Sequence, residues 1–290
     1  MSSTRDEYTG YSPKLSTLSP YYFKTTLLAY GTESETSTYE FSPSIHGGIV
    51  KLTFPSFVSR VNNDIVGFRQ TRRISVILNG GLDYSQVGQN PLDGTAMISG
   101  YTKANSDGVG SSDADFKHFF VMLIYSGQDG NEPTKFQEKN SKFDSQSAWI
   151  DFEPENPKHK QLTIRFATSF ISTTQAMQNL LYEVGVDNCQ SFESLLKEAK
   201  LDWHNTLSRV KIAQMTPEDT GYTQEAIDSL YTIFYSSLYR SSLFPRQLSE
   251  ITSTGQVVHW SPYANGNTTE RVCSGALSTD SGILIFLIIT

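Results

Sequence analysis

Residues 47–58, GGIVKLTFPSFV, combine β-branched and aromatic side chains and begin with the glycine pair Gly47-Gly48. Side chains of these two types favour the pleated surface of a β-strand, and glycine is common in the turns that precede strands. The segment is therefore predicted to be a strand. Whether it belongs to an all-β domain depends on what surrounds it.

Similar segments lie on both sides of this stretch at fairly regular intervals. One of them, RRISVILNGG, ends on Asn79-Gly80, which is a turn signal. Polar, turn-rich stretches such as GQDGNEPT and ENPKHKQ separate the segments, and no helical period of useful length interrupts them. Together they predict an antiparallel β-sandwich or barrel that extends to about residue 170. The expected strands lie in residues 21–30, 47–58, 72–81, 95–103, 117–127, 147–153 and 160–172.

The pattern changes from strand-like to helical after residue 170. Residues 191–210 and 216–244 place apolar side chains at near-helical spacing, which predicts two helical segments. Thr216, followed by Pro217, Glu218 and Asp219, is a plausible start of a helix or turn. The apolar positions are Phe192, Leu195, Leu196, Ala199, Trp203 and Leu207 in the first segment, and Ile227, Leu230, Phe234 and Leu238 in the second.

Composition excludes several classes of function. The net charge of -7 and the lack of a long basic run argue against a nucleic-acid partner. The first twenty residues have no apolar core typical of a signal peptide. The apolar run Ile283–Ile289 is much shorter than the about 20 residues of a membrane span, so no membrane partner is expected. Cys189 and Cys273 lack metal-ligand spacing.

Catalytic motifs with a recognisable spacing are absent from the sequence, but residues 237–267 gather aromatic and polar side chains. Trp260 and Tyr263 offer flat apolar faces to a sugar ring, and Arg246, Glu250 and His259 offer directional hydrogen bonds. These five residues form the candidate substrate-binding set. The alternative is an aromatic-rich segment between domains that is buried for packing alone.

At this point the sequence resembles glycoside hydrolase family 92, the calcium-dependent exo-acting α-mannosidases. The resemblance rests on DWHNTLSRVKI, LYTIFYSSLYRSSLFPRQLSE and GQVVHWSPY, in that order and spacing. Upstream, SPYYFKTTLLAYG and HGGIVKLTFPS are similar to early strands of the family, and LLYEVGVDNCQSFESLLKEAKLDW is similar to its bridging helices. The similarity extends from about residue 10 to about residue 282, and FYSSLYRSSLFPR is its most specific block.

The resemblance implies an architecture. It predicts a sandwich domain of the galactose-mutarotase-like supersandwich type over residues 1–170 and a helical linker over residues 171–210. The start of a truncated (α/α)₆ barrel then covers residues 211–282. In the family the sugar site lies between the two domains and calcium contacts the mannose. One carboxylic acid protonates the leaving oxygen, and a carboxylate base activates water with inversion. By the same resemblance, the acid, the base and the calcium ligands lie beyond residue 290, so no catalytic or metal residue is assigned here.

The resemblance also bears on the tail. LSTDSG, residues 277–282, follows the family pattern, whereas residues 283–290 do not, so they are interpreted as a non-native apolar terminus. A buried C-terminal strand is the second interpretation, and a membrane anchor the third.

The predicted function is that of a fragment of an α-mannosidase that trims terminal α-mannose from N-glycans during glycoprotein catabolism, with the isolated chain inactive. One alternative is a non-catalytic carbohydrate-binding sandwich. Another is a product without activity that exposes apolar side chains such as Phe234 and Leu238.

Overall fold

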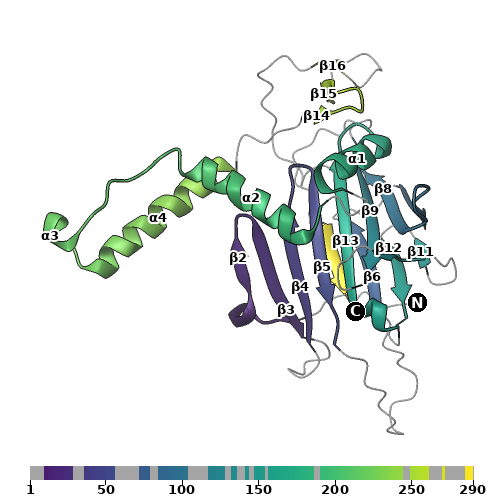
Figure 1. Ribbon diagram of the computed structural model, residues 1–290, viewed down its shortest axis with the longest axis horizontal. Coiled ribbons are helices and arrows are strands. Elements are labelled where there is room, and N and C mark those ends of the chain that lie inside the picture. Colours follow the sequence, from purple (N-terminus) through teal and green to yellow (C-terminus); the bar gives the residue numbers. More distant parts are fainter. Residues whose placement is uncertain are drawn as a thin grey trace, which may run out of the picture.

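The computed structural model covers all 290 residues of the chain. It describes residues 10–28, 36–55, 72–78, 84–103, 117–127, 132–135, 141–143, 147–153, 156–185, 190–243, 249–260, 270–271 and 285–289. Among these residues the chain forms two packed β-sheets, a small third sheet and a set of helices that leads away from the sheets (Figure 1).

The larger sheet has ten strands, and eight of them follow the order β1-β3-β4-β5-β13-β9-β8-β7. Two short strands pair outside this path, β2 with β3 and β10 with β9. Every pairing is antiparallel, as the succession of strand signals predicts. The strands are β1 (Gly10–Tyr11), β2 (Thr17–Ser19), β3 (Tyr22–Leu28), β4 (Thr36–Pro43), β5 (Gly47–Thr53), β7 (Tyr84–Gln89), β8 (Ala96–Thr102), β9 (His118–Ser126), β10 (Glu132–Pro133) and β13 (Gln161–Ser169).

The second sheet lies against one face of the first. It contains β11 (Ser141–Phe143), β12 (Ser147–Phe152), β6 (Arg72–Leu78) and β17 (Ile285–Ile289), in that order. The apolar tail of the sequence is thus an edge strand that pairs antiparallel with β6, from Ile285 opposite Leu78 to Ile289 opposite Ile74. This pairing agrees with the second interpretation of the tail as a strand. The non-native origin of residues 283–290 stays a prediction.

The main core lies between these two sheets, as a sandwich requires. Each fully buried Val, Ile, Leu or Phe contributes about 1.5–3 kcal/mol through removal of apolar surface from water. The larger sheet supplies Val50, Leu52, Ala96, Ile98, Phe120, Met122, Ile124, Leu162 and Ile164, and the smaller sheet supplies Ile74, Val76, Ala148, Ile150 and Phe152.

Helices cover the opposite face of the larger sheet. Helix α1 (Thr173–Asn179) and the π-helical turn Leu180–Val184 pack on β9 and β13, with Val121 and Leu123 against Ala176 and Leu180. Helix α2 (Phe192–Leu207) packs beside them through Phe192 and Leu195 against Ile49. The central strands are therefore buried on both faces. This explains why β9 reads as a continuous apolar run instead of an alternating one.

The glycine pair that begins residues 47–58 lies inside β5, where neighbouring backbone comes close. A Cβ atom on Gly47 would lie 2.0 Å from the carbonyl oxygen of Phe166, and one on Gly48 would lie 2.4 Å from that of Ser42. Both contacts are shorter than any side chain tolerates. The two glycines thus allow β4 and β13 to approach β5.

Beyond α2 the chain leaves the sheets. Helices α3 (Pro217–Thr220) and α4 (Gln224–Ser242) project outward, and the small sheet of β14 (Glu250–Ile251), β15 (Val257–His259) and β16 (Glu270–Arg271) lies near the end of α1 (Figure 1). Helix formation at both predicted segments is confirmed. In α2 the predicted positions Phe192, Leu195 and Ala199 are buried and the other three are half-buried. In α4 Ile227 is buried and Leu230 is 42% exposed.

Candidate functional site

Three of the five sugar residues predicted from the sequence lie on or next to the hairpin of β14 and β15. Glu250 begins β14, His259 ends β15, and Trp260 follows directly. Arg246 and Tyr263 lie outside the described residues. The structure therefore places three of the five candidates on one short element next to helix α1 (Figure 1).

Glu250 is fully buried, and both oxygens of its carboxylate accept hydrogen bonds. Oε1 accepts from the backbone N–H of Phe170 at 2.9 Å, and Oε2 accepts from Nδ2 of Asn179 at 2.8 Å. A buried carboxylate is tolerated only when such donors compensate for its lost hydration. In the described structure this side chain ties β14 to the end of β13 and to α1. Direct contact of Glu250 with a sugar stays a prediction.

Two amide side chains of α1 extend this network. Gln175 Nε2 donates to the carbonyl oxygen of Ile251 at 2.8 Å and to Oδ1 of Asn179 at 2.9 Å. Asn179 Nδ2 also donates to the carbonyl oxygen of Thr168 at 2.9 Å. The two residues are one helical turn apart, so they present their amides on the same face of α1. The hairpin is thus held to the larger sheet by side-chain hydrogen bonds as well as by packing.

A histidine–glutamate pair lies at the same end of the larger sheet. Glu183 accepts from the backbone N–H of His46 at 2.8 Å, and its other oxygen contacts Nδ1 of the same histidine. Burial opposes the charged imidazole, but the hydrogen bond and charge of Glu183, with a further contribution from Glu250, raise the pKa of His46 above its ordinary value. Burial also opposes the charged carboxylate, but His46 outweighs it and the pKa of Glu183 is lowered. The pair is therefore held in its ionic form.

The end of the hairpin carries the two aromatic side chains that suit a sugar. His259 and Trp260 are both half-buried, and the preceding Val258 is buried and fixes the strand. Nδ1 of His259 is buried and has no hydrogen-bond partner within the part of the chain that the structure describes. An indole offers an apolar face and an imidazole a directional hydrogen bond, so a role of these two residues in sugar binding stays a prediction.

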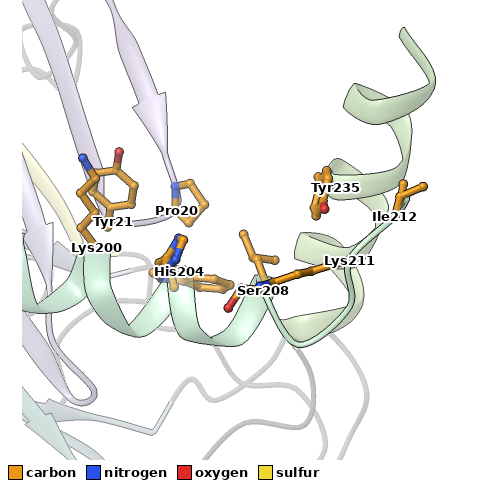
Figure 2. Close-up of a pocket in the computed structure, with 10 residues that line it drawn as sticks. Pro20, Tyr21, Lys200, His204, Ser208, Lys211, Ile212 and Tyr235 are labelled. Carbon is orange, nitrogen blue, oxygen red and sulfur yellow. The ribbon is translucent and has the colours of Figure 1, made fainter. Parts of the chain in front are cut away.

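A hollow lies between α2, α4 and the turn that joins β2 to β3. It has a volume of about 570 Å³, and Figure 2 shows Pro20 and Tyr21 of the turn facing α2 while Tyr235 belongs to α4. The lining residues are Pro20, Tyr21, Lys200, Trp203, His204, Leu207, Ser208, Lys211, Ile212 and Tyr235, which we call the α2 groove.

Calcium, expected from the family resemblance, needs several oxygen ligands around one point. Within the described ranges no three His, Cys, Asp or Glu side chains gather in a way that would hold a metal ion. Calcium stays an expectation from the resemblance, and no chemical step is assigned to the ion on this chain. In the same part of the chain, no helix has the length and apolar character needed to cross a membrane.

Comparison with known proteins supports the resemblance. Residues 175–275 match the family model described as the glycosyl hydrolase family 92 catalytic domain. This segment begins within α1 and contains α2, α3, α4 and the β14–β15 hairpin. The predicted resemblance to this family is thereby confirmed. No curated protein matches the chain.

Solved structures of the same family share the fold. An inverting mannosidase of family GH92 from Bacteroides thetaiotaomicron superposes with a TM-score of 0.62 and 23% identity, over 99% of this chain and 32% of that one. The GH92 family glycosyl hydrolase ccman5 gives 0.57 and 17%, over 92% and 32%. A GH92 α-mannosidase from the same Bacteroides species gives 0.51 and 17%, over 91% and 31%. At such identities the likeness shows the fold, and the chain spans about a third of each structure.

Four residues of the network were missed by reasoning from the sequence. Gln175, Asn179, His46 and Glu183 are separated in the chain by up to 137 residues and belong to no short motif. The only sequence signal for Gln175, Asn179 and Glu183 was a polar side chain in a helical segment, which surface residues share, and His46 lies in the bend between β4 and β5. The packing of α1 on β13 brings them together.

Proposed function

We propose that this chain supplies the sandwich and the first helices of a glycoside hydrolase of the family 92 α-mannosidase type. The observation that carries the proposal is the match of residues 175–275 to the family's catalytic-domain model, within a chain whose whole fold is shared with family members. The proposal includes the finer architecture. The sandwich is of the galactose-mutarotase-like type, and α4 is the first helix of an (α/α)₆ barrel.

The hairpin supplies one wall of the sugar site in this proposal. His259 and Trp260 meet a terminal α-mannose unit from the sandwich side, with Arg246 and Tyr263 in the adjoining segment. Glu250 acts as a positioning residue, because both of its oxygens are occupied by protein donors. By the family resemblance, a calcium ion would contact the mannose, and two carboxylates of a facing barrel would carry the inverting hydrolysis of terminal α-mannose in N-glycans during glycoprotein catabolism.

Isothermal titration of the purified chain with methyl α-mannoside tests the proposal. Half a site lacks the groups that converge from the other side, so saturable but weak binding is expected, with a Kd of roughly 1 mM or above. Trp260→Ala should abolish it, because the indole supplies the apolar platform. Tyr222→Ala, which removes another exposed ring outside the hairpin, should leave it unchanged.

Two results would contradict the proposal. One is mannoside binding that survives Trp260→Ala, and the other is no saturable binding at all. Hydrolysis of an aryl α-mannoside by the chain with added calcium is expected to be undetectable, because a two-carboxylate mechanism needs both carboxylates. Turnover would show that the acid and base lie within these 290 residues.

A further inference from the structure

The α2 groove brings together three aromatic side chains from three elements. Tyr21 comes from the turn after β2, Trp203 from α2 and Tyr235 from α4, and all three are half-buried. Trp203 also packs on Tyr239 of α4 with ring centroids 5.0 Å apart, so the joint between the two helices is formed by aromatic contact. The volume of about 570 Å³ lies within the range of ligand sites, about 300–1,000 Å³.

The polar lining of the groove is positively charged, although the chain carries a net charge of -7. Lys200, His204 and Lys211 line it, and none of the ten described lining residues is Asp or Glu. His204 lies in the last turn of α2, where a cation is favoured by the helix dipole in any case. The positive charge that distinguishes the groove therefore comes from Lys200 and Lys211.

Both lysines are exposed to solvent at the rim of the groove. Within the described residues no carboxylate forms an ion pair with Lys200 or Lys211. Lys200 lies over the ring of Tyr21, with Nζ 5.8 Å from the centroid. Figure 2 shows Lys200 and Tyr21 together at one end of the groove, and Lys211 toward the end that faces Tyr235. Two ammonium groups thus lie along a path lined with aromatic rings.

We infer that the α2 groove binds an acidic saccharide, that is, a chain of sugar rings that carries negative groups. Aromatic faces pack on the apolar faces of sugar rings, and the lysines and His204 donate hydrogen bonds to acceptor-rich substituents. The hydroxyls of Tyr21, Ser208 and Tyr235 can accept as well as donate, so the preference for negative groups over neutral hydroxyls comes from the two lysines, which only donate. The site is separate from the hairpin and does not depend on the proposed function.

A matched pair of probes isolates the charge. Tetragalacturonate and its fully methyl-esterified form have the same rings, but only the first carries carboxylates. Calorimetric titration of the full 290-residue chain should show saturable binding of the acid. Binding of the ester should be at least about tenfold weaker, since charge-assisted hydrogen bonds are roughly twice as strong as neutral ones. In an NMR titration the acid should shift the indole signal of Trp203 and leave that of Trp260 in place.

Variants assign the site. The double variant Lys200→Met/Lys211→Met keeps the length of both side chains, and it should weaken binding of the acid by about tenfold or more. Lys135→Met, an exposed lysine outside the groove, should bind like the parent chain. Equal binding of acid and ester would overturn the inference, as would an unaffected double variant, a response of Trp260 in place of Trp203, or no binding of either probe.

Discussion

At the scale of single residues, the most informative side chain is the carboxylate of Glu250. It is fully buried, and its two oxygens accept from Phe170 N–H and from Asn179. Glu250→Gln keeps the shape but turns one oxygen into an amide donor, which must face another donor. We expect the free energy of unfolding to fall by about 2–3 kcal/mol, because one buried donor is left unsatisfied and a hydrogen bond to a charged group is lost.

Urea denaturation measures this loss. Glu153→Gln, a matched change at an exposed glutamate, should alter stability by less than about 0.5 kcal/mol. Equal stability of the two variants would show that the buried network does not hold the hairpin in solution.

The His46–Glu183 pair predicts a dependence of stability on pH. The raised pKa of His46 stabilises the fold below the unfolded value of 6.5, and this contribution is lost as the pH rises through the folded pKa. The lowered pKa of Glu183 stabilises the fold above its unfolded value of 4.5, and this contribution is lost as the pH falls through the folded pKa. Both contributions are complete between pH 4.5 and 6.5.

The variant Glu183→Gln isolates this pair. The difference in unfolding free energy between the parent chain and the variant should be largest between pH 4.5 and 6.5, and smaller at pH 8. Because burial lowers the pKa of His118 to about 3, that residue stays neutral in the fold and destabilises both proteins as the pH falls below 6.5. The contribution of His118 is therefore the same in the parent chain and the variant, and it cancels from the difference in their unfolding free energies. A difference that does not change with pH would contradict the ionic pair.

At the scale of elements, helix α1 connects the larger sheet to the hairpin. Its residues Gln175 and Asn179 donate to Ile251, Thr168 and Glu250. Asn179→Ala should loosen the hairpin without unfolding the sheets, and amide hydrogen exchange in residues 249–260 should become about tenfold faster. Gln178→Ala on the same helix serves as the control, and β9 should remain protected in both. Unchanged exchange in the hairpin would show that packing alone holds it.

Sequence reasoning predicted the elements unevenly, for physical reasons. Strand β9 was predicted because burial on both faces selects a continuous apolar run, and β13 because Leu162, Ile164 and Phe166 alternate with more polar residues. Strands β4 and β7 were missed, since their sequences TSTYEFSP and YSQVGQ are largely polar. β7 is the last strand in the order of the larger sheet, and several of its side chains are exposed. Its pairing with β8 is made by backbone hydrogen bonds, which the amino-acid composition of a segment does not indicate.

The same limit applies to the candidate site. His259, Trp260 and Glu250 were selected because aromatic and hydrogen-bonding side chains are concentrated in one stretch of sequence. Their distinct roles emerge only from the three-dimensional contacts, since burial and two donors identify Glu250 as an anchor. Partners supplied from distant segments, such as His46 with Glu183, have no local pattern.

At the scale of the whole molecule, the two sheets and their covering helices form a platform, and α4 and the hairpin extend from it (Figure 1). The chain spans about a third of the mannosidase structures whose fold it shares. Sugar recognition at the hairpin is therefore the part of the proposed function that this chain can display by itself. The α2 groove, which lies between the platform and α4, is a separate candidate site.

The three tryptophans of the chain allow the central claim to be tested in one measurement. Trp149 lies under the guanidinium of Arg73, Trp203 packs on Tyr239, and Trp260 ends the hairpin. In a ¹H–¹⁵N NMR titration with methyl α-mannoside, we expect a saturable shift of the Trp260 indole signal, while the signals of Trp149 and Trp203 stay in place. A shift at Trp149 or Trp203 alone, or at none of the three, would contradict the assignment of the hairpin as the mannose-facing wall.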